Sequence, residues 1–507
     1  MNALRASAAA MAALMAVLAV QPVSAQVPNF DDKPTGFLTV KTGGMPADAW
    51  NGTSLATAKR LVSALPVAPR SRALRDLQFK VLVSELTPPA PDGSPPPGLF
   101  FRKVEKLAAM GEGESLNEMV RNAGGYADPA IATIVANAMM MAGERQGACA
   151  IVRNWQLTEP FGRRADAACR LLDGESAGAA PASGQADGPA VMALDLSRGQ
   201  APAAWLSSMQ PPVIRALVGM KSLPIATRLD VAERGEALAI VEATRLGDLY
   251  LEAVRNGASL PPAMARRAQL VAAARNASNP EEIVNSIIAV YSDVRGSPLF
   301  PTVARASAAG LLSLPAKPQF ARVAQEAMRG FLLLGDKQQA QAWTRLALGA
   351  AYNNVQALTA LDRLLPLAAI AGIDDPKRLP LNEVNRWYLV LQENDAARAP
   401  LRGYLLLELF RATGIDVPPR STELPEVPPA NARLVMPPAA TLQALQAAAA
   451  GRRRAEASLL ASIAASETPL SELHPAAIAT IVRALRQVGE DHAARLFAIE
   501  TAIAYGL

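Results

Sequence analysis

Few residues of this chain have the types and spacings that catalysis or metal binding requires. Its 507 residues include two cysteines, Cys149 and Cys169, and two histidines, His474 and His492. Neither histidine has a cysteine, a second histidine or a pair of acids at a metal-binding spacing, and the common phosphate-binding and nucleophile motifs are absent. His474 precedes Pro475 and fits a helix start, and His492 follows a turn and fits a surface or capping role. We therefore expect no catalytic residue, no metal and no cofactor.

The two cysteines are expected to form a disulfide. One helix, starting near Gln146, carries Cys149, and a second helix, from about Arg163 to Leu172, carries Cys169. As antiparallel neighbours rising about 1.5 Å per residue, these helices would place the cysteines at nearly equal height, within the roughly 4.4 to 6.8 Å between Cα atoms that a bridge requires. The bond would persist in an oxidising compartment and would stabilise the fold by about 3 kcal/mol. The alternative is two buried free thiols packing as small apolar residues.

Two glutamates are each followed by serine, in Glu114-Ser115 and Glu175-Ser176, and both pairs fall at helix-to-helix turns. The pairing is similar to the catalytic Glu-Ser of soluble lytic transglycosylases, exported enzymes that cut peptidoglycan and carry a long α-superhelix before the catalytic domain. This resemblance would imply a cell-wall enzyme or its helical accessory part. The family's surrounding sequence and its Gly-Leu-Met-Gln element are absent, and the chain is only 5% aromatic, whereas sugar sites usually present Trp or Tyr faces. We expect both glutamates to be turn residues.

The densest basic run is Arg452-Arg453-Arg454, directly after Gly451. Such a run can dock onto an anionic surface such as lipid headgroups or cell-wall polymers, but three charges at the solvated start of a helix are also common. The chain as a whole has 50 Lys and Arg against 45 Asp and Glu, spread along its length. This mild excess is ordinary surface chemistry, and we expect no nucleic-acid binding.

A repeated helix–turn–helix pattern would position these residues. Its clearest copy runs from Phe331 to Trp343, with an apolar helix end, Gly335, Asp336 and then Ala340. Glycine permits the left-handed conformation that closes a helix, the acid favours the positive start of the next helix, and alanine allows close approach. The same frame recurs, with a weaker last copy, at Gly143-Glu144, Gly174-Glu175, Gly489-Glu490 and Gly111-Glu112.

This turn resembles that of tetratricopeptide-like helical repeats, and the glycines at 111, 143 and 174 are spaced at close to the roughly 34-residue period of that class. The early Trp, the Gly-x-x-Tyr and the closing Pro of the full repeat are absent. More loosely, the chain resembles exported, Ala-rich bacterial helical proteins of unknown function. Half of the residues are hydrophobic, and Ala and Leu supply most of them, which favours closely packed helices over strands. We expect an all-α fold of αα-hairpin repeats in an extended or curved solenoid.

The N-terminus has the pattern of a secretory signal peptide. Arg5 precedes an apolar run from Ala6 to Val20, and small residues, Val23 and Ala25, precede the expected cleavage point. The alternative is a retained membrane anchor, but this run is short for the roughly 20 residues that a bilayer span needs. We expect cleavage after Ala25, a periplasmic or secreted product, and no transmembrane segment in the mature chain.

Stretches rich in proline and glycine divide the rest of the chain into units. The expected organisation is a signal peptide at 1–25, an extended leader at 26–49, an N-terminal helical hairpin domain at 50–176, a flexible linker at 177–190, a central helical-repeat domain at 191–415, a Pro-rich linker at 416–440 and a C-terminal helical domain at 441–507.

From this organisation we expect an exported helical-repeat scaffold that binds another envelope protein or a cell-wall component, and that is not an enzyme. The alternative is the cell-wall enzyme, or helical accessory part of one, described above. An enzyme should bring acids or a nucleophile together in one pocket. A scaffold should instead present an elongated groove without such a group.

Overall fold

The structure is a computed structural model that describes residues 30–126, 128–155, 157, 161–173, 201, 203–352, 354, 361–362, 364–373, 381–417, 423–430 and 433–507. Over these ranges the protein is all-α, and its only extended pairing is in isolated β-bridges such as Leu38–Ser84. Successive helices pack against one another, so the expected all-α arrangement of stacked helix pairs is confirmed.

The helices form four groups in chain order. The first is η1 (Phe30–Asp32), η2 (Val40–Thr42), α2 (Leu55–Ala64), α3 (Arg72–Val83), α4 (Leu99–Ala109), α5 (Gly113–Asn122), α6 (Pro129–Ala142), α7 (Arg145–Trp155) and α8 (Phe161–Leu172). The second is α10 (Ala203–Leu206), α11 (Pro211–Gly219), α12 (Ile225–Ala237), α13 (Ala243–Arg255), α14 (Pro262–Asn276), α15 (Pro280–Asp293), α16 (Phe300–Ala306) and α17 (Ala308–Leu312). The third is η3 (Pro318–Val323), α18 (Ala324–Leu334), α19 (Lys337–Ala351), α21 (Leu365–Ile370), α22 (Leu381–Asn394) and α23 (Ala399–Ala412). The fourth is α24 (Ala439–Ala450), α25 (Arg454–Ala465), α26 (Pro475–Gln487) and α27 (Asp491–Ala504).

The turn at Gly335 shows how the hairpins close. Gly335 has φ 70°, the left-handed conformation that ends α18, and the backbone N–H of Asp336 donates to the carbonyl of Phe331 at 3.0 Å. The Asp336 carboxylate then accepts from the backbone N–H of Gln339 at the start of α19. Gly143 and the glycines at 111 and 489 also have positive φ. The frame predicted at Gly174 lies outside the described residues.

Arginines complete many helix ends. The last carbonyls of a helix have no partner within it, and a guanidinium supplies both the missing donor and a charge that suits the negative end of the helix dipole. These donations join sequence-distant parts of the chain: Arg275 to Ala306, Arg402 to Tyr505, Arg486 to Ala412 and Arg495 to Ile370, at 2.8 to 3.1 Å.

Two segments expected to be a leader and a linker are packed where the structure describes them. In the leader, the backbone N–H groups of Phe37 and Leu38 donate to the carbonyl of Val83 at the end of α3. In the Pro-rich stretch, Val435 exchanges backbone hydrogen bonds with the segment before α26, donating to Glu472 and accepting from His474. The linker expected at 177–190 lies outside the described residues.

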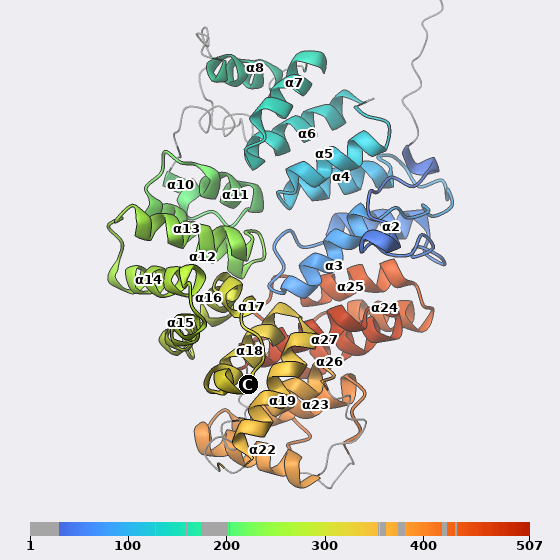
Figure 1. The fold of residues 1–507 in the computed structure, drawn as a ribbon. Helices are drawn as coiled ribbons and strands as arrows, with labels where there is room; N and C mark the ends of the chain where they lie inside the picture. Colours follow the sequence, from blue (N-terminus) through green and yellow to red (C-terminus); the bar gives the residue numbers. More distant parts are fainter. Residues whose placement is uncertain are drawn as a thin grey trace, which may run out of the picture.

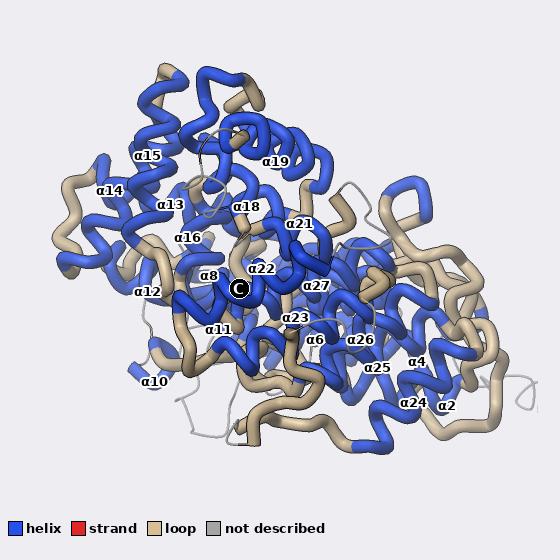
Figure 2. Tube along the Cα trace, turned by 90° about the horizontal axis from the view of Figure 1, so that it is seen from below, coloured by secondary structure: helices blue, strands red, loops and turns tan. Residues whose placement is uncertain are grey.

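The last helices complete the core around α3, near the start of the chain. Helices α25 and α27 pack directly on α3, and α27 also packs on α18. Figure 1 shows α2–α8 and α10–α17 as two columns of helices, with α24 and α25 beneath α2 and α3. Seen from below, α12–α15 lie on one side of the molecule and α2, α4, α24 and α25 on the other (Figure 2). No helix in the described ranges is long and apolar enough to cross a membrane.

Candidate functional site

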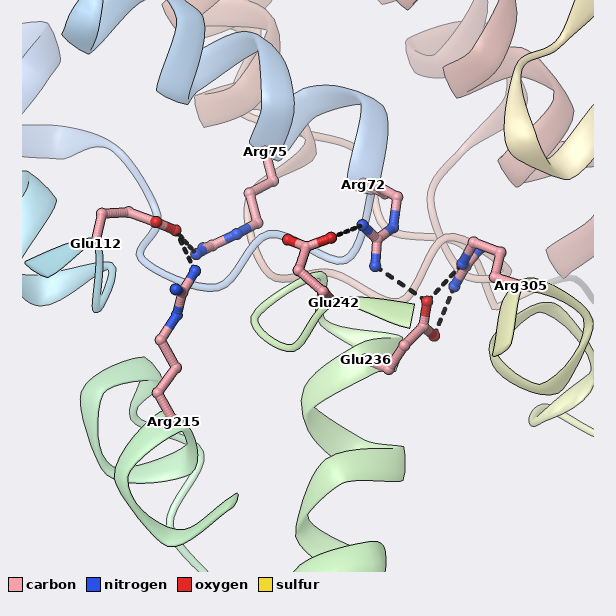
Figure 3. A network of polar contacts seen from close by, with 7 residues as sticks. All are labelled: Arg72, Arg75, Glu112, Arg215, Glu236, Glu242 and Arg305. Carbon is pink, nitrogen blue, oxygen red and sulfur yellow. Dashed lines mark hydrogen bonds and ion pairs between the residues drawn. The ribbon is translucent and has the colours of Figure 1, made fainter. Parts of the chain in front are cut away.

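Helix α3 carries the charged cluster that is the candidate site. Ser71 caps the helix by accepting from the backbone N–H of Leu74, and one face of the first turns carries Arg72, Arg75 and Asp76 at helical i, i+3, i+4 spacing. The other positions are mostly apolar, and the helix packs against α25 and α27. The charged face of α3 is directed toward the column formed by α10–α17. The arginines of α3 therefore lie between the two columns of helices (Figure 3).

Glu236 at the end of α12 is the most enclosed member of the cluster. Its carboxylate is fully buried and accepts from Arg72 at 3.0 Å. It also accepts from two nitrogens of Arg305 on α16, at 2.6 and 2.9 Å. Burial by itself would lower the pKa of Arg305, but the carboxylates of Glu236, Glu500 and Asp76 together outweigh it and the pKa is raised. One carboxylate therefore joins α3, α12 and α16 (Figure 3).

A second carboxylate, Glu112 before α5, joins α3 to α11. One of its oxygens accepts from both Arg75 and Arg215, each at 2.6 Å. Arg75 also donates to the carbonyls of Val67 and Met110, so its guanidinium is held at several points. Burial lowers the pKa of Arg75 and the Glu112 charge opposes that effect. Because two guanidiniums share one carboxylate oxygen, this part of the cluster carries an excess positive charge.

Two further acids, Asp76 and Glu242, lie at the exposed edge of the cluster. Glu242 is 70% exposed and sits 3.9 Å from a nitrogen of Arg72. The helices packed around Asp76 partly desolvate its carboxylate and so raise its pKa, although the residue as a whole is exposed; the charge of Arg72 acts against this shift and that of Glu242 adds to it. Both acids offset the positive charge of the arginines in the cluster.

The C-terminal helix adds a carboxylate at the start of α3. Glu500 accepts from the Ser71 hydroxyl at 2.5 Å and from the backbone N–H of Ala73 at 3.2 Å. A carboxylate suits this place because the first N–H groups of a helix lack partners and the dipole is positive there. Burial raises the pKa of Glu500 to about 6. The start of α3 is thus completed by a residue more than 400 positions later in the sequence.

The chemistry of the cluster is ion pairing. Each guanidinium drawn in Figure 3 faces a carboxylate, and the pairs join helices from the first and second groups. Among the described residues no three acids, histidines or cysteines are arranged to hold a metal ion. The arrangement is suited to fixing the two columns of helices against each other.

The two cysteines lie where the sequence predicted. Cys149 on α7 and Cys169 on α8 are both buried, their Cα atoms are 5.6 Å apart, and their sulfurs are at bonding distance. The two helices pack against each other, as the argument from equal height required. The pair ties the last two described helices of the first group together.

The acid and histidines considered for catalysis lie at the starts of three different helices, α5, α26 and α27. Glu114 is exposed in the first turn of α5, where its side chain hydrogen-bonds to that of Glu144 and thereby raises the pKa of Glu144. His474 caps α26 through its Nδ1, which accepts from the backbone N–H of Ala476, and burial lowers its pKa. His492 is exposed on α27. Glu175 lies outside the described residues.

The basic run before α25 is partly used within the chain. Arg453 pairs with Glu456 at 2.8 Å, and Arg454 pairs with Glu490 at 2.6 Å. Glu490 also pairs with Lys80 on α3, so Arg454 belongs to the contacts between α3 and the C-terminal helices. These two arginines thus have partners within the fold instead of standing freely in solvent.

Neither the cluster around the acids at 112 and 236 nor their arginine partners were predicted from the sequence. The signal that could have drawn attention to α3 is a pair of arginines, Arg72 and Arg75, on a helix whose other positions are mostly apolar. The partners carry no such signal, because Glu236 and Arg305 are ordinary charged residues in ordinary helices. No family model, curated protein or solved structure shows significant similarity to this chain.

Proposed function

We propose that the protein is an exported helical-repeat scaffold that binds another protein or a cell-wall component of the bacterial envelope. The observation that supports it best is the architecture of consecutively packed helix pairs, because stacked helical hairpins generally serve as extended binding surfaces. Kinship with tetratricopeptide-like repeats is part of this proposal and rests on the glycine turns alone.

Export is supported by two independent features. The residues up to Ala25 follow the order of a signal peptide, with Arg5, an apolar run and small residues before the cleavage point. Cys149 and Cys169 lie at disulfide distance, which suits an oxidising compartment. The mature chain would begin at Gln26 and act in the periplasm or outside the cell.

The scaffold role is tested by capture from the envelope fraction of the native host. The mature chain carries an affinity tag, is crosslinked and purified, and its partners are identified by mass spectrometry. We expect one or a few envelope components in saturable amounts, competed by untagged protein. A capture profile identical to that of an unrelated exported helical protein would contradict the proposal.

The enzyme alternative is tested on purified peptidoglycan. The folded protein should release no soluble fragments. Replacing Glu114, Glu175, His474 or His492 by Ala, one at a time, should leave any measured activity or phenotype intact. Fragment release that Glu114→Gln abolishes while the thermal stability is unchanged would replace the scaffold by a cell-wall enzyme.

A further inference from the structure

The outer face of α24 is uncharged. The chain has no acidic or basic residue between Arg433 and Arg452, a stretch that includes all of α24. Other sides of the helix pack on α25 and α26. The positions that stay exposed recur at helical spacing along one face, and they are Ala439, Ala440, Gln443, Gln446, Ala447 and Ala450. This face lacks the charged side chains that a solvated helix surface usually carries.

The two ends of this face carry opposite charges. Arg452 follows the last turn of α24, is exposed, and makes no ion pair with a described residue. At the other end, Val435 exchanges backbone hydrogen bonds with Glu472 and His474, which places the exposed Glu472 beside the start of α24. The carboxylate of Glu472 also makes no ion pair within the described ranges. One free cation and one free anion therefore flank the uncharged face.

Arg452 holds a backbone conformation that other helix ends of this chain give to glycine. Its φ is 51°, and the N–H of Arg453 donates to the carbonyl of Ala448 at 2.9 Å to close α24. Gly335 and Gly489 take the left-handed conformation in their turns. A residue with a Cβ is less stable there than glycine. The fold thus holds an exposed arginine at some cost, which favours a binding role for its side chain.

We propose that α24 is the contact face of a homodimer, in which two copies pack α24 against α24 in antiparallel directions about a two-fold axis. An axis across the middle of the helix brings the Arg452 end of each copy to the Glu472 end of the other, so both charges gain a partner. The small alanines let the helix axes approach to about 8 Å. Gln443 and Gln446, near the axis, can donate and accept hydrogen bonds across it.

A membrane surface fits this face less well than a second copy does. Helices that lie in a lipid interface carry Trp, Phe or Leu on the buried face. The large apolar side chains exposed beside α24 are Val435 and Met436, which are 43% and 49% exposed and lie at one end only. The negative charge of Glu472 at that same end would be repelled by anionic lipid. The pairing of opposite charges therefore decides for a second copy.

The dimer should be weak. Helix α24 has 12 residues, so its face is about 18 Å long and about 10 Å wide. Even with the flanking side chains, this is less than the roughly 800 Å² that each partner buries in a standard interface. We expect a dissociation constant on the order of 100 μM.

Sedimentation of the mature chain tests the proposal, at concentrations from about one-twentieth to about five times the expected dissociation constant. We expect the mass to rise from one copy toward two. Arg452→Glu and Glu472→Arg should each weaken the dimer about ten-fold or more, and the double variant that carries both should restore it. Both residues are exposed, so all three variants should keep the thermal stability of the wild type.

Matched variants separate the proposed pairing from general effects. The exposed Arg433 lies at the Glu472 end, where it would oppose the partner's Arg452, so Arg433→Ala should strengthen the dimer. Gln446→Cys should give a disulfide-linked dimer under mild oxidation because its position is near the axis. Gln269→Cys, at an exposed position of α14, should not.

Four results would overturn the proposal. The first is a single-copy mass at every concentration. The second is a double variant that associates no better than Arg452→Glu alone. The third is a weakening by Arg433→Ala as large as that by Arg452→Glu, which would mean that only total charge matters. The fourth is binding of the single-copy protein to phosphatidylglycerol vesicles that Arg452→Glu abolishes, which would make a membrane the partner of this face.

Discussion

Replacing Glu236 by Ala should destabilise the protein more than any other single change in the charge cluster. The side chain is fully buried and accepts three N–H groups from Arg72 and Arg305. Its removal leaves the guanidinium of Arg305, whose side chain is 9% exposed, without the carboxylate that it binds directly, and only the more distant charges of Glu500 and Asp76 remain. Breaking a buried pair in this way costs about 3 to 5 kcal/mol, because the partner's charge is kept from water and loses its hydrogen-bonded counterion.

Glu242 is the matched control, since it contacts the same Arg72 in the same cluster. It is 70% exposed and its closest approach is 3.9 Å, so Glu242→Ala should cost less than about 1 kcal/mol. The free energy of unfolding is measured by urea denaturation and compared between the two variants and the wild type. If Glu236→Ala and Glu242→Ala have the same midpoint, the argument from burial is wrong.

A double replacement examines the cause of the loss. Glu236→Met combined with Arg305→Met removes both charges and fills similar volume, and exchanging a buried ion pair for apolar residues is often neutral. We expect the double variant to be more stable than Glu236→Ala. A double variant as unstable as Glu236→Ala would show that the loss comes from packing and not from the unpaired guanidinium.

Glu500→Gln should leave the free energy of unfolding unchanged below about pH 4.5, the ordinary pKa of a glutamate, because the wild-type carboxyl is then protonated in both states. Above pH 6 the variant should be more stable than the wild type by about 2 kcal/mol, because the raised pKa of Glu500 means that burying its ionised carboxylate is unfavourable. Urea denaturation at pH 4.5 and 7.5 checks this, and a larger gain at pH 4.5 would reverse the sign. Thiol counting on denatured, unreduced periplasmic protein should find Cys149 and Cys169 oxidised, and two free thiols would disprove the bridge. Sequencing of the native protein should find Gln26 at its N-terminus, whereas retained Met1 would contradict export.

Local features of this fold were predictable because their causes are local. A glycine that ends a helix and an acid that starts the next lie side by side in sequence, and the turns at Gly143, Gly335 and Gly489 have the expected left-handed backbone. The proximity of Cys149 and Cys169 followed from helix rise and turn positions, which also require only nearby residues. His474 at a helix start followed from the proline after it.

The candidate site was not predictable for the opposite reason. Arg72 and Arg305 bind the same carboxylate of Glu236, and Glu500 completes the start of α3, although the partners are 69 to 429 positions apart in sequence. Helical periodicity predicts which face of α3 is apolar. It does not predict which sequence-distant helix packs against the charged face. The basic run shows the same limit, since Arg454 could be assigned a partner only once α26 and α27 had been placed beside it.

The completion of α3 by Glu500 has a consequence for the order in which the chain can fold. Synthesis delivers α3 long before α25 and α27, so its apolar faces have no native cover until the last helices are available. Hairpins joined by short turns, such as α6–α7 and α18–α19, can form early because their contacts are local. The first group as a whole can complete its packing only after α25 and α27 have been synthesised. Deleting α27 should therefore uncover the part of α3 that α25 does not cover.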